Sequence, residues 1–475
     1  MTDKEFAVDF LSRLPFEPNE QQMKTAMALA RFCLPSADYR NDRVFILNGY
    51  AGTGKTSLTG ALVKSLQAQK IDTMLLAPTG RAAKVFSQSA GFPAYTIHRK
   101  IYRHMLAGAM AAGPIPQENK LKNAVFIVDE ASMIGSETET GSNLLTDLIH
   151  FVYSGAGCKL ILMGDTAQLP PVGQTESPGM NPDALRTYGL KVTRATLTDV
   201  ARQSADSGIL RNATRLRRAL TAPDEQVPQI VPMAVSGVGD VSVVEGADLP
   251  EVLDSLYRRD GVEETIIITR SNQTATEFNR GIRQMVLDRM EELSRDDLLI
   301  AAKNNYHWTR RVKGLDFVAN GEVLRMIKVK GTERRYGLRF ADVVLEIADR
   351  PGLEFDAKVI LDGLHGNAAA LDGESYKRLY EGIYTDAEFM PAEATHETRL
   401  KILRESPDWN ALQVKYAYAV TCHKAQGGQW KNVMVDLSYV PPEQLGKEFF
   451  RWLYTAVTRA RQHLYLINPP EVVVE

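Results

Sequence analysis

The sequence predicts an α/β fold with parallel sheets, and three segments lead to this expectation. Each segment is a short apolar run that ends in a glycine-rich or acidic stretch: residues 44–47 before GYAGTGKT, residues 124–128 before Asp129 and Glu130, and residues 159–163 before GDTAQ. Continuous apolar runs of this length are typical of strands buried on both faces of a parallel sheet. The polar residues then lie at the carboxyl ends of the strands, where open α/β sheets bind their ligands.

Size and composition indicate a multidomain chain without covalent or metal crosslinks. Its 475 residues are 44% hydrophobic and 24% charged, which is typical of globular domains. The net charge of −2 requires any groove for a polyanion to be local. Three cysteines without a C-x-x-C pair argue against a disulfide framework and a zinc site. No apolar run approaches the roughly 18 residues of a membrane span, so we expect a cytoplasmic chain, or one in the host cytoplasm if it is viral.

The first segment predicts a phosphate-binding loop. Residues 49–56 match G-x-x-x-x-G-K-[ST], and Leu58, Leu62 and Leu66 follow with the spacing of one helical face. Backbone groups of such a loop curl around an anion at a helix start, the lysine reaches the β- and γ-phosphates, and the hydroxyl can bind Mg²⁺. The alternative is an ordinary glycine-rich turn. The residues expected to hold a nucleotide here are Gly49, Ala51, Gly52, Thr53, Gly54, Lys55 and Thr56.

The second and third segments supply groups for hydrolysis. Asp129 can hold Mg²⁺ through its water shell, together with Thr56, and Glu130 can deprotonate a water that attacks the γ-phosphate. The alternative is that these acids only cap the start of a helix. Gln168 can hydrogen-bond the γ-phosphate or the attacking water, whereas an isolated loop amide more often faces solvent.

The order of these and later segments resembles superfamily 1 helicases, and more closely the 1B branch of RecD- and Dda-type DNA helicases. The resemblance covers nearly the whole chain. APTGRAA, HKAQG and AVTRAR are more specific than the phosphate-binding loop, because P-loop kinases and small GTPases lack them. The segments similar to family motifs I, Ia, Ib, II, III, IV, V and VI are GYAGTGKT, LLAPTGRAAKVF, YTIHRKIY, VDEAS, GDTAQLPPVG, LTDVARQ, AVTCHKAQGGQW and LYTAVTRARQHL.

The resemblance implies roles for further residues. Gln22 matches the element that contacts adenine, and Arg202 and Arg459 match the arginines of motifs IV and VI. An arginine delivered from a second domain can neutralise the charge that spreads over the γ-phosphoryl group. The residues expected to contact the nucleic-acid strand are Pro78, Thr79, His98, His423 and Lys424. A lone histidine is, however, more often a hydrogen-bonded structural residue than a ligand contact.

The resemblance also implies an architecture of two RecA-like P-loop domains in tandem. We expect the first at residues 1–95 and 124–190, with a small inserted subdomain at 96–123 that carries a strand-separating pin. We expect the second at residues 191–295 and 411–475, with an insert at 296–410. Short alternating segments in this insert predict a small barrel, and the resemblance implies that this barrel is SH3-like. Residues 373–389 are predicted to form a helical arm.

The implied function is an ATP-dependent DNA helicase that uses Mg²⁺, translocates on single-stranded DNA, 5′-to-3′ by resemblance only, and separates duplex strands. The implied partners are single-stranded DNA, its junctions with duplex, and replication or single-strand-binding proteins, with the chain acting as a monomer. An RNA-directed motor or a remodeller of protein–nucleic acid complexes stays open as the alternative. A P-loop kinase and a nucleotide switch without motor activity fit the later motifs less well.

Overall fold

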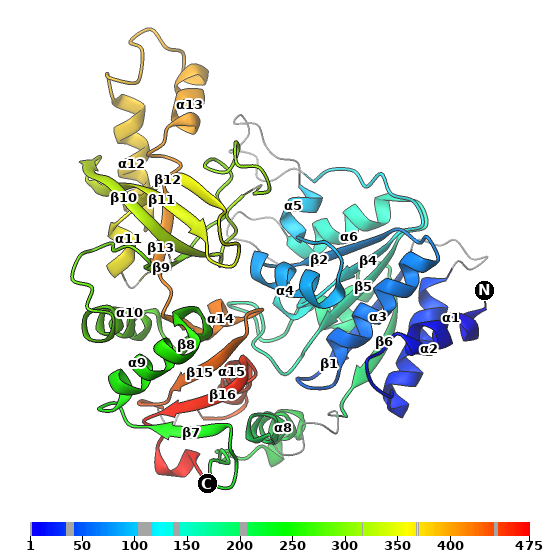
Figure 1. Cartoon of the computed structure of the whole chain (residues 1–475). Coiled ribbons are helices and arrows are strands. Elements are labelled where there is room, and N and C mark those ends of the chain that lie inside the picture. The colour runs from blue at the N-terminus through cyan, green and yellow to red at the C-terminus, as the bar shows by residue number, and fades with distance from the viewer. Residues whose placement is uncertain are drawn as a thin grey trace.

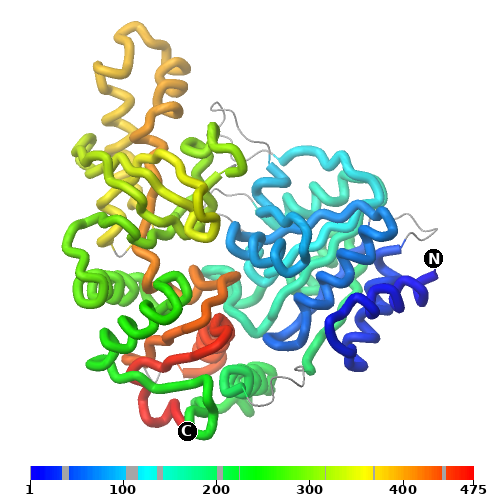
Figure 2. The backbone as a smooth tube through the Cα atoms, in the orientation of Figure 1, coloured from blue at the N-terminus to red at the C-terminus, as the bar shows by residue number. Residues whose placement is uncertain are grey.

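Figure 1 shows the computed structural model, which describes residues 2–34, 42–102, 116–135, 143–199, 207–315, 317–366, 368, 370–440 and 445–475. Within these residues the chain forms two parallel sheets with helices on their faces and one closed barrel. The backbone trace in Figure 2 shows the N-terminal sheet unit beside the C-terminal one, with the barrel next to the C-terminal unit. The predicted α/β class is confirmed.

The first unit is built on a six-stranded sheet in which all neighbours are parallel. Its central strands are the predicted apolar runs, which explains why they lack polar alternation. In spatial order the strands are β3 (Ala94–Thr96), β2 (Thr73–Ala77), β4 (Val125–Val128), β5 (Lys159–Gly164), β1 (Arg43–Gly49) and β6 (Lys191–Leu197).

Helices cover both faces of this sheet. Strand β1 packs against both layers of helices, because its successive side chains point to opposite faces. Phe45 and Leu47 pack with α1, α2, α3 and α4, whereas Val44 and Ile46 pack with α5, α6 and α7. The helix bounds are α1 (Asp3–Ser12), α2 (Glu20–Cys33), α3 (Lys55–Ala68), α4 (Gly80–Ala90), α5 (Ile97–Ile101), α6 (Leu144–Ser154) and α7 (Pro182–Arg186).

The second unit is built on a five-stranded sheet, again parallel throughout. In spatial order its strands are β14 (Ala419–Thr421), β8 (Thr265–Thr269), β15 (Trp430–Asp436), β16 (Ala460–Ile467) and β7 (Val241–Val244). Its helices are α8 (Gly208–Thr221), α9 (Leu249–Asp260), α10 (Asn272–Gly281), which continues as a π-turn over Ile282–Val286, α14 (Cys422–Ala425) and α15 (Lys447–Val457).

Between β8 and β14 the chain forms a closed five-stranded barrel, as the alternating segments predicted. Its strands, in spatial order, are β10 (Val323–Arg335), β11 (Leu338–Ile347), β12 (Glu354–Ile360), β13 (Leu412–Tyr416) and β9 (Leu298–Ala301). The predicted arm is α12 (Gly373–Thr385), which packs against α13 (His396–Glu405) and projects beyond the barrel in Figure 1; the short helix α11 (Asp362–His365) follows β12.

Two of the expected boundaries differ from the structure by one strand. Residues 191–197 were expected to begin the second unit, but β6 pairs with β1 along its whole length and completes the first sheet. Residues 411–416 were expected to return to the second unit, but β13 pairs with β9 and closes the barrel. In both places a strand pairs with the unit that precedes it in the chain, and sequence patterns do not report strand partners.

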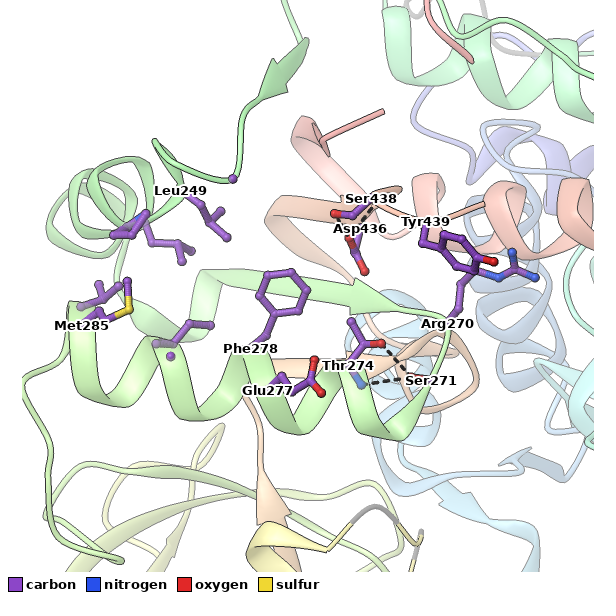
Figure 3. A pocket seen from close by; sticks show the side chains of 16 residues that line it. Leu249, Arg270, Ser271, Thr274, Glu277, Phe278, Met285, Asp436, Ser438 and Tyr439 are labelled. Atoms are coloured by element: carbon purple, nitrogen blue, oxygen red, sulfur yellow. Dashed lines mark hydrogen bonds between the residues drawn. The ribbon is translucent and has the colours of Figure 1, made fainter. Parts of the chain in front are cut away.

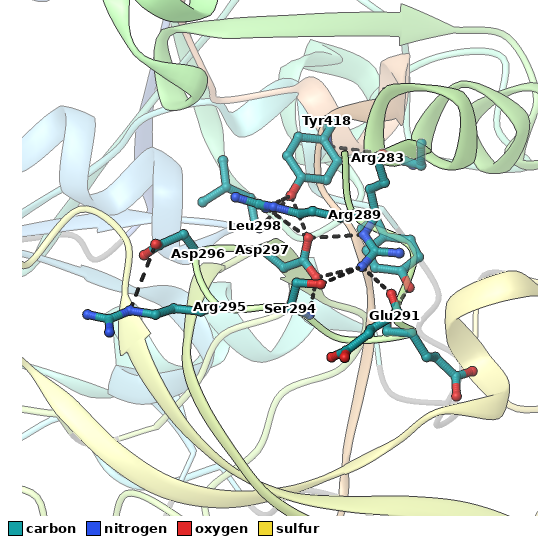
Figure 4. A network of polar contacts seen from close by, with 12 residues as sticks. Arg283, Arg289, Glu291, Ser294, Arg295, Asp296, Asp297, Leu298 and Tyr418 are labelled. Atoms are coloured by element: carbon teal, nitrogen blue, oxygen red, sulfur yellow. Dashed lines mark hydrogen bonds and ion pairs between the residues drawn. The ribbon is translucent and has the colours of Figure 1, made fainter. Parts of the chain in front are cut away.

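A buried cluster of charges joins the barrel to the second sheet (Figure 4). Asp297, next to β9, is completely buried and accepts hydrogen bonds from Arg283 at 3.0 Å, Arg289 at 2.9 Å and Tyr418 at 2.8 Å. Arg283 follows α10 and Tyr418 lies between β13 and β14. The cluster therefore fixes the two points at which the chain enters and leaves the barrel.

The structure describes the first and last parts of the expected inserted subdomain. Residues 97–101 form α5, and Tyr102 forms a bridge with Pro116. Residues 103–115 of the subdomain expected to carry the pin lie outside the described residues. Among the described helices, none combines the length and the apolar character that crossing a membrane requires.

Candidate functional site

The glycine-rich loop between β1 and α3 has the geometry of an anion site. Gly52 and Gly54 have φ values of 75° and 78°, a left-handed conformation that favours glycine. A Cβ on Gly54 would lie only 2.8 Å from Nε2 of Gln22. Helix α3 begins at Lys55 without a side-chain cap on its first amides. These amides and the positive end of the helix dipole are therefore available to a phosphate.

Side chains of the loop and its surroundings hold this conformation. Lys55 donates from Nζ to the carbonyl of Gly49 at 3.2 Å, which folds the ammonium over the loop. Thr53 is buried and donates to the carbonyl of Tyr50 at 2.8 Å. The hydroxyl-bearing Thr56, on the first turn of α3, is exposed.

Gln22 lies against the loop rather than on the surface. Its Nε2 donates to the carbonyl of Thr53 at 3.1 Å, and its Oε1 accepts from the amide of Asn19 in the capping box of α2. The side chain of Gln22 therefore supports the phosphate-binding loop directly, a role that the sequence did not predict. That adenine contact stays a prediction.

Two acidic residues follow β4, beside the loop. Burial raises the pKa of Asp129 to about 6, although the nearby Lys55 opposes this rise. Glu130 is in the left-handed region at φ 51°, which is unusual outside glycine and occurs at strained functional positions. Its Oε2 is buried and accepts no hydrogen bond. An acceptor in this condition can receive a proton or bind water.

The loop after β5 completes the group. Asp165 is 1% exposed and burial raises its pKa, with Lys55 again acting in the opposite direction. Gln168 is buried and its Oε1 has no hydrogen-bond partner. Because β4, β5 and β1 are neighbours in the sheet, their carboxyl ends bring Lys55, Glu130 and Gln168 to one edge. The structure thus brings three of the five residues expected to act on a γ-phosphate to one sheet edge.

The second unit contacts this edge through α15 and the turn after α14. The amide of Leu169 donates to Oγ1 of Thr455 at 2.8 Å, and Nε2 of Gln426 donates to the carbonyl of Leu169 at 2.9 Å. The hydroxyl of Tyr454 accepts from the amide of Ala51 at 3.0 Å and donates to Asp165 at 2.6 Å. Sequence reasoning missed Tyr454 and Asp165. Their positions in LYTAVTRA and GDTAQ were the available signal.

The two expected arginines have different outcomes. Arg459 is 4% exposed and donates to the carbonyls of Thr455 and Gly428, both in its own unit. The structure therefore does not bring Arg459 into contact with the phosphate-binding loop. Arg202 lies outside the described residues.

The residues expected to contact a strand lie at other strand ends. Pro78 and Thr79 follow β2, and Thr79 caps α4 by accepting from the amide of Ala82 at 3.2 Å. His423 and Lys424 lie in α14, and burial lowers the pKa of both. Gly427, two residues beyond α14, is so close to α4 that a Cβ there would lie 3.5 Å from Oγ1 of Thr79. The turn after α14 and the start of α4 are therefore adjacent.

His98 lies in α5, after the strand that pairs with β2, so its segment also reaches this edge of the sheet. Burial lowers its pKa, and its ring lies 5.6 Å from that of Tyr102. These contacts fit a structural histidine as well as a strand contact. The role of His98 stays a prediction.

A separate hollow of about 630 Å³ lies in the second unit, between α9, α10 and the end of β15 (Figure 3). Arg270 and Tyr439 lie at one end of this hollow and Met285 at the other. None of the residues expected to bind nucleotide or strand lines it. It is therefore not part of the candidate site.

The fold and site define a P-loop α/β protein in which a second α/β unit contacts the phosphate-binding edge of the first through α15 and the turn after α14. Family models agree. The AAA domain family matches residues 36–227, and the UvrD-like helicase C-terminal domain family matches residues 416–467.

Two relatives indicate more specifically which kind of P-loop protein this chain resembles. The ATP-dependent RecD2 DNA helicase of Deinococcus radiodurans is 33% identical over 175 residues, which are 36% of this chain and 21% of that protein. This chain thus spans about a fifth of that relative. The ATP-dependent DNA helicase Dda of Enterobacteria phage T4 is 24% identical over 332 residues, 63% of this chain and 68% of that protein. The two family models and these relatives together support a helicase of superfamily 1B.

A solved structure of Pif1 helicase from Bacteroides, in complex with ADP-AlF3 and single-stranded DNA, covers 96% of this chain and 94% of its own. It has a TM-score of 0.46 and 16% sequence identity, a likeness too distant for an inference about function.

Proposed function

We propose that the chain is an ATP-driven DNA helicase. The observation that carries this proposal is the meeting of Lys55, Glu130 and Gln168 at one sheet edge that a second α/β unit contacts through α15. A phosphoryl-transfer site needs mainly positioning and charge stabilisation, and these side chains supply both. Because a second unit contacts the same edge, hydrolysis can be coupled to a movement of the two units relative to each other.

In this proposal Thr56 and Asp129 would hold Mg²⁺. The residues fit the ion, because a carboxylate whose pKa burial raises to about 6 gains from a nearby cation, and the hydroxyl of Thr56 is exposed to bind one. Mg²⁺ supplies neutralisation of the phosphate charge when bound. Glu130, whose Oε2 is buried without a partner, takes the proton from the attacking water.

The motor consists of two RecA-like units, with the barrel as an SH3-like insert of the second. Closure of the units around ATP brings arginines of the second unit toward the phosphates, and hydrolysis lets the units part. Arg202 and Arg459 fill this role by family match. Because Arg459 is now bonded within its own unit, the role requires its guanidinium to leave the carbonyls of Thr455 and Gly428.

Single-stranded DNA lies across the strand ends that carry Thr79, His98 and Lys424. Hydroxyl, imidazole and ammonium groups suit phosphates and sugars, which fits binding without sequence preference. Translocation is 5′-to-3′, the chain works as a monomer, and junctions and single-strand-binding proteins are its partners. An RNA-directed motor or a remodeller of protein–nucleic acid complexes is the second candidate, since the same groups contact either sugar.

Two assays test the proposal. ATP turnover is expected to rise at least tenfold on adding single-stranded DNA, equivalent to about 1.4 kcal/mol of barrier, and equal rates would refute the motor. Unwinding of duplexes with a 5′ or a 3′ tail, in DNA and RNA versions, separates polarity and substrate. Arg459→Ala is expected to keep nucleotide binding and lose hydrolysis, and an equal fall in both would remove the arginine from the mechanism.

A further inference from the structure

Tyr454 makes a contact between the two units that packing alone does not require. The side chain is 1% exposed, and its hydroxyl bonds in two directions, as an acceptor from the amide of Ala51 and a donor to Asp165. Ala51 belongs to the phosphate-binding loop and Asp165 to the loop after β5. One phenol on the second unit thus joins two loops of the first.

The partners of this hydroxyl are themselves enclosed. Asp165 is 1% exposed, and its second oxygen accepts from the amide of Ala167 at 2.9 Å. Burial raises the pKa of Tyr454, so the phenol keeps its proton and donates it to the carboxylate of Asp165. A phenylalanine would fill the same space and leave the Ala51 amide and one carboxylate oxygen unpaired, which buried polar groups avoid.

The contact continues toward the strand-binding edge through the next residues. Thr455 accepts from the amide of Leu169, whose carbonyl accepts from Gln426. Gln426 directly precedes Gly427, which packs against Ala82 and Thr79 at the start of α4. A continuous series of polar and packing contacts therefore runs from the phosphate-binding loop to the residues expected to contact DNA.

We propose that Tyr454 is a positioning residue whose hydroxyl couples the phosphate-binding loop to the strand-binding edge, so that bound DNA accelerates ATP turnover through it. The proposal rests on the proposed function and adds to it the group that transmits the stimulation. Tyr454 acts through the backbone of Ala51 and through Asp165, and touches no reacting atom. Physical coupling of this kind needs a contiguous series of contacts between the two sites. The hydroxyl begins this series at Ala51 and Asp165, and the contacts of Leu169 with Thr455 and Gln426 continue it.

The test is the ratio of ATP turnover with saturating single-stranded DNA to turnover without it. For Tyr454→Phe we expect this ratio to fall at least fivefold. Asp165→Asn, which keeps an acceptor oxygen for the phenol, is expected to retain more of the ratio than Asp165→Leu. The control is Tyr153→Phe, which removes a phenol that donates to the carbonyl of Arg43 at 2.6 Å within the first unit, and it is expected to keep the ratio.

The outcomes separate this inference from the proposed function. A wild-type ratio of one would refute the helicase proposal itself. A wild-type ratio above ten that Tyr454→Phe retains would overturn the role of Tyr454, whatever happens to the absolute rates. A fall of both rates by the same factor, with a lower melting temperature, would show a structural role only and would also overturn it.

Discussion

Glu322 lies where the barrel meets the first unit, and its replacement by glutamine is expected to change how stability depends on pH. A Cβ on Gly80, the first residue of α4, would lie 2.9 Å from Oε2 of Glu322. Burial, and then the neighbouring Asp349, raise the pKa of Glu322 to about 7, while Arg350 and Lys84 oppose the rise. Lys84 is itself paired with Asp349 at 2.5 Å.

The magnitude follows from the difference between the two states. The ordinary value is 4.5, so the pKa rises by about 2.5, and at about 1.4 kcal/mol per pH unit the full difference is about 3.5 kcal/mol. Because the folded chain holds this proton more tightly than the unfolded chain, the contribution of Glu322 to stability falls as the pH rises from about 4.5 to about 7. Glu322→Gln is therefore expected to match the wild type near pH 4 and exceed it by about 3 kcal/mol near pH 8.

The assay is the free energy of unfolding from urea titrations at both pH values, with fluorescence and circular dichroism required to give coincident transitions. Glu388→Gln serves as control, because that side chain is 75% exposed and is expected to change stability equally little at both values. If Glu322→Gln had the same pH dependence as the wild type, Glu322 would titrate normally and its desolvation beside α4 would be refuted.

Three further changes test other parts of the molecule. Lys55→Ala is expected to lower ATP turnover at least about hundredfold, because it removes a phosphate contact. The control is Lys64→Ala on the exposed side of α3, which is expected to keep the wild-type turnover. Similar turnover in the two variants would exclude Lys55 from catalysis. Gly427→Ala places a Cβ 2.9 Å from the Cβ of Ala82 and puts alanine at a φ of 72°. We therefore expect the free energy of unfolding to fall by about 1–2 kcal/mol and the affinity for fluorescent single-stranded DNA to decrease. Its control is Gly331→Ala, where a Cβ meets nothing within 4 Å, and equal DNA affinities would contradict the contact. Asp297→Ala leaves the buried Arg283 and the partly buried Arg289 without their carboxylate and is expected to cost about 3–5 kcal/mol. The control is Asp296→Asn, which is expected to cost little because that side chain is 51% exposed and asparagine tolerates the φ of 63° at this position. A small effect at Asp297 would show that water replaces the carboxylate.

The parts of the fold predictable from sequence were those with a local signal. The apolar runs before Gly49, Asp129 and Gly164 identified the central strands, because strands buried on both faces have no other pattern. The partners of β6 and β13 were not predictable, since pairing depends on residues far away in the chain.

The same limit applies to the site. Lys55, Glu130 and Gln168 followed from motif spacing and meet in space, because parallel strands share one edge. Tyr454 was missed because its two partners, Ala51 and Asp165, are about 400 and 290 residues distant. The bonding of Arg459 within its own unit is likewise a property of the folded chain, which spacing does not report.

The attachment of the barrel has an evolutionary consequence. The chain enters through β9 and leaves through β13, and these strands are antiparallel neighbours with Leu299 opposite Tyr416. The two ends of the insert therefore lie side by side, as in domains that tolerate transplantation between hosts. A lineage could lengthen or replace the arm of this module while the two sheets kept their connection, whereas the barrel loops that contact α4 are constrained by the first unit.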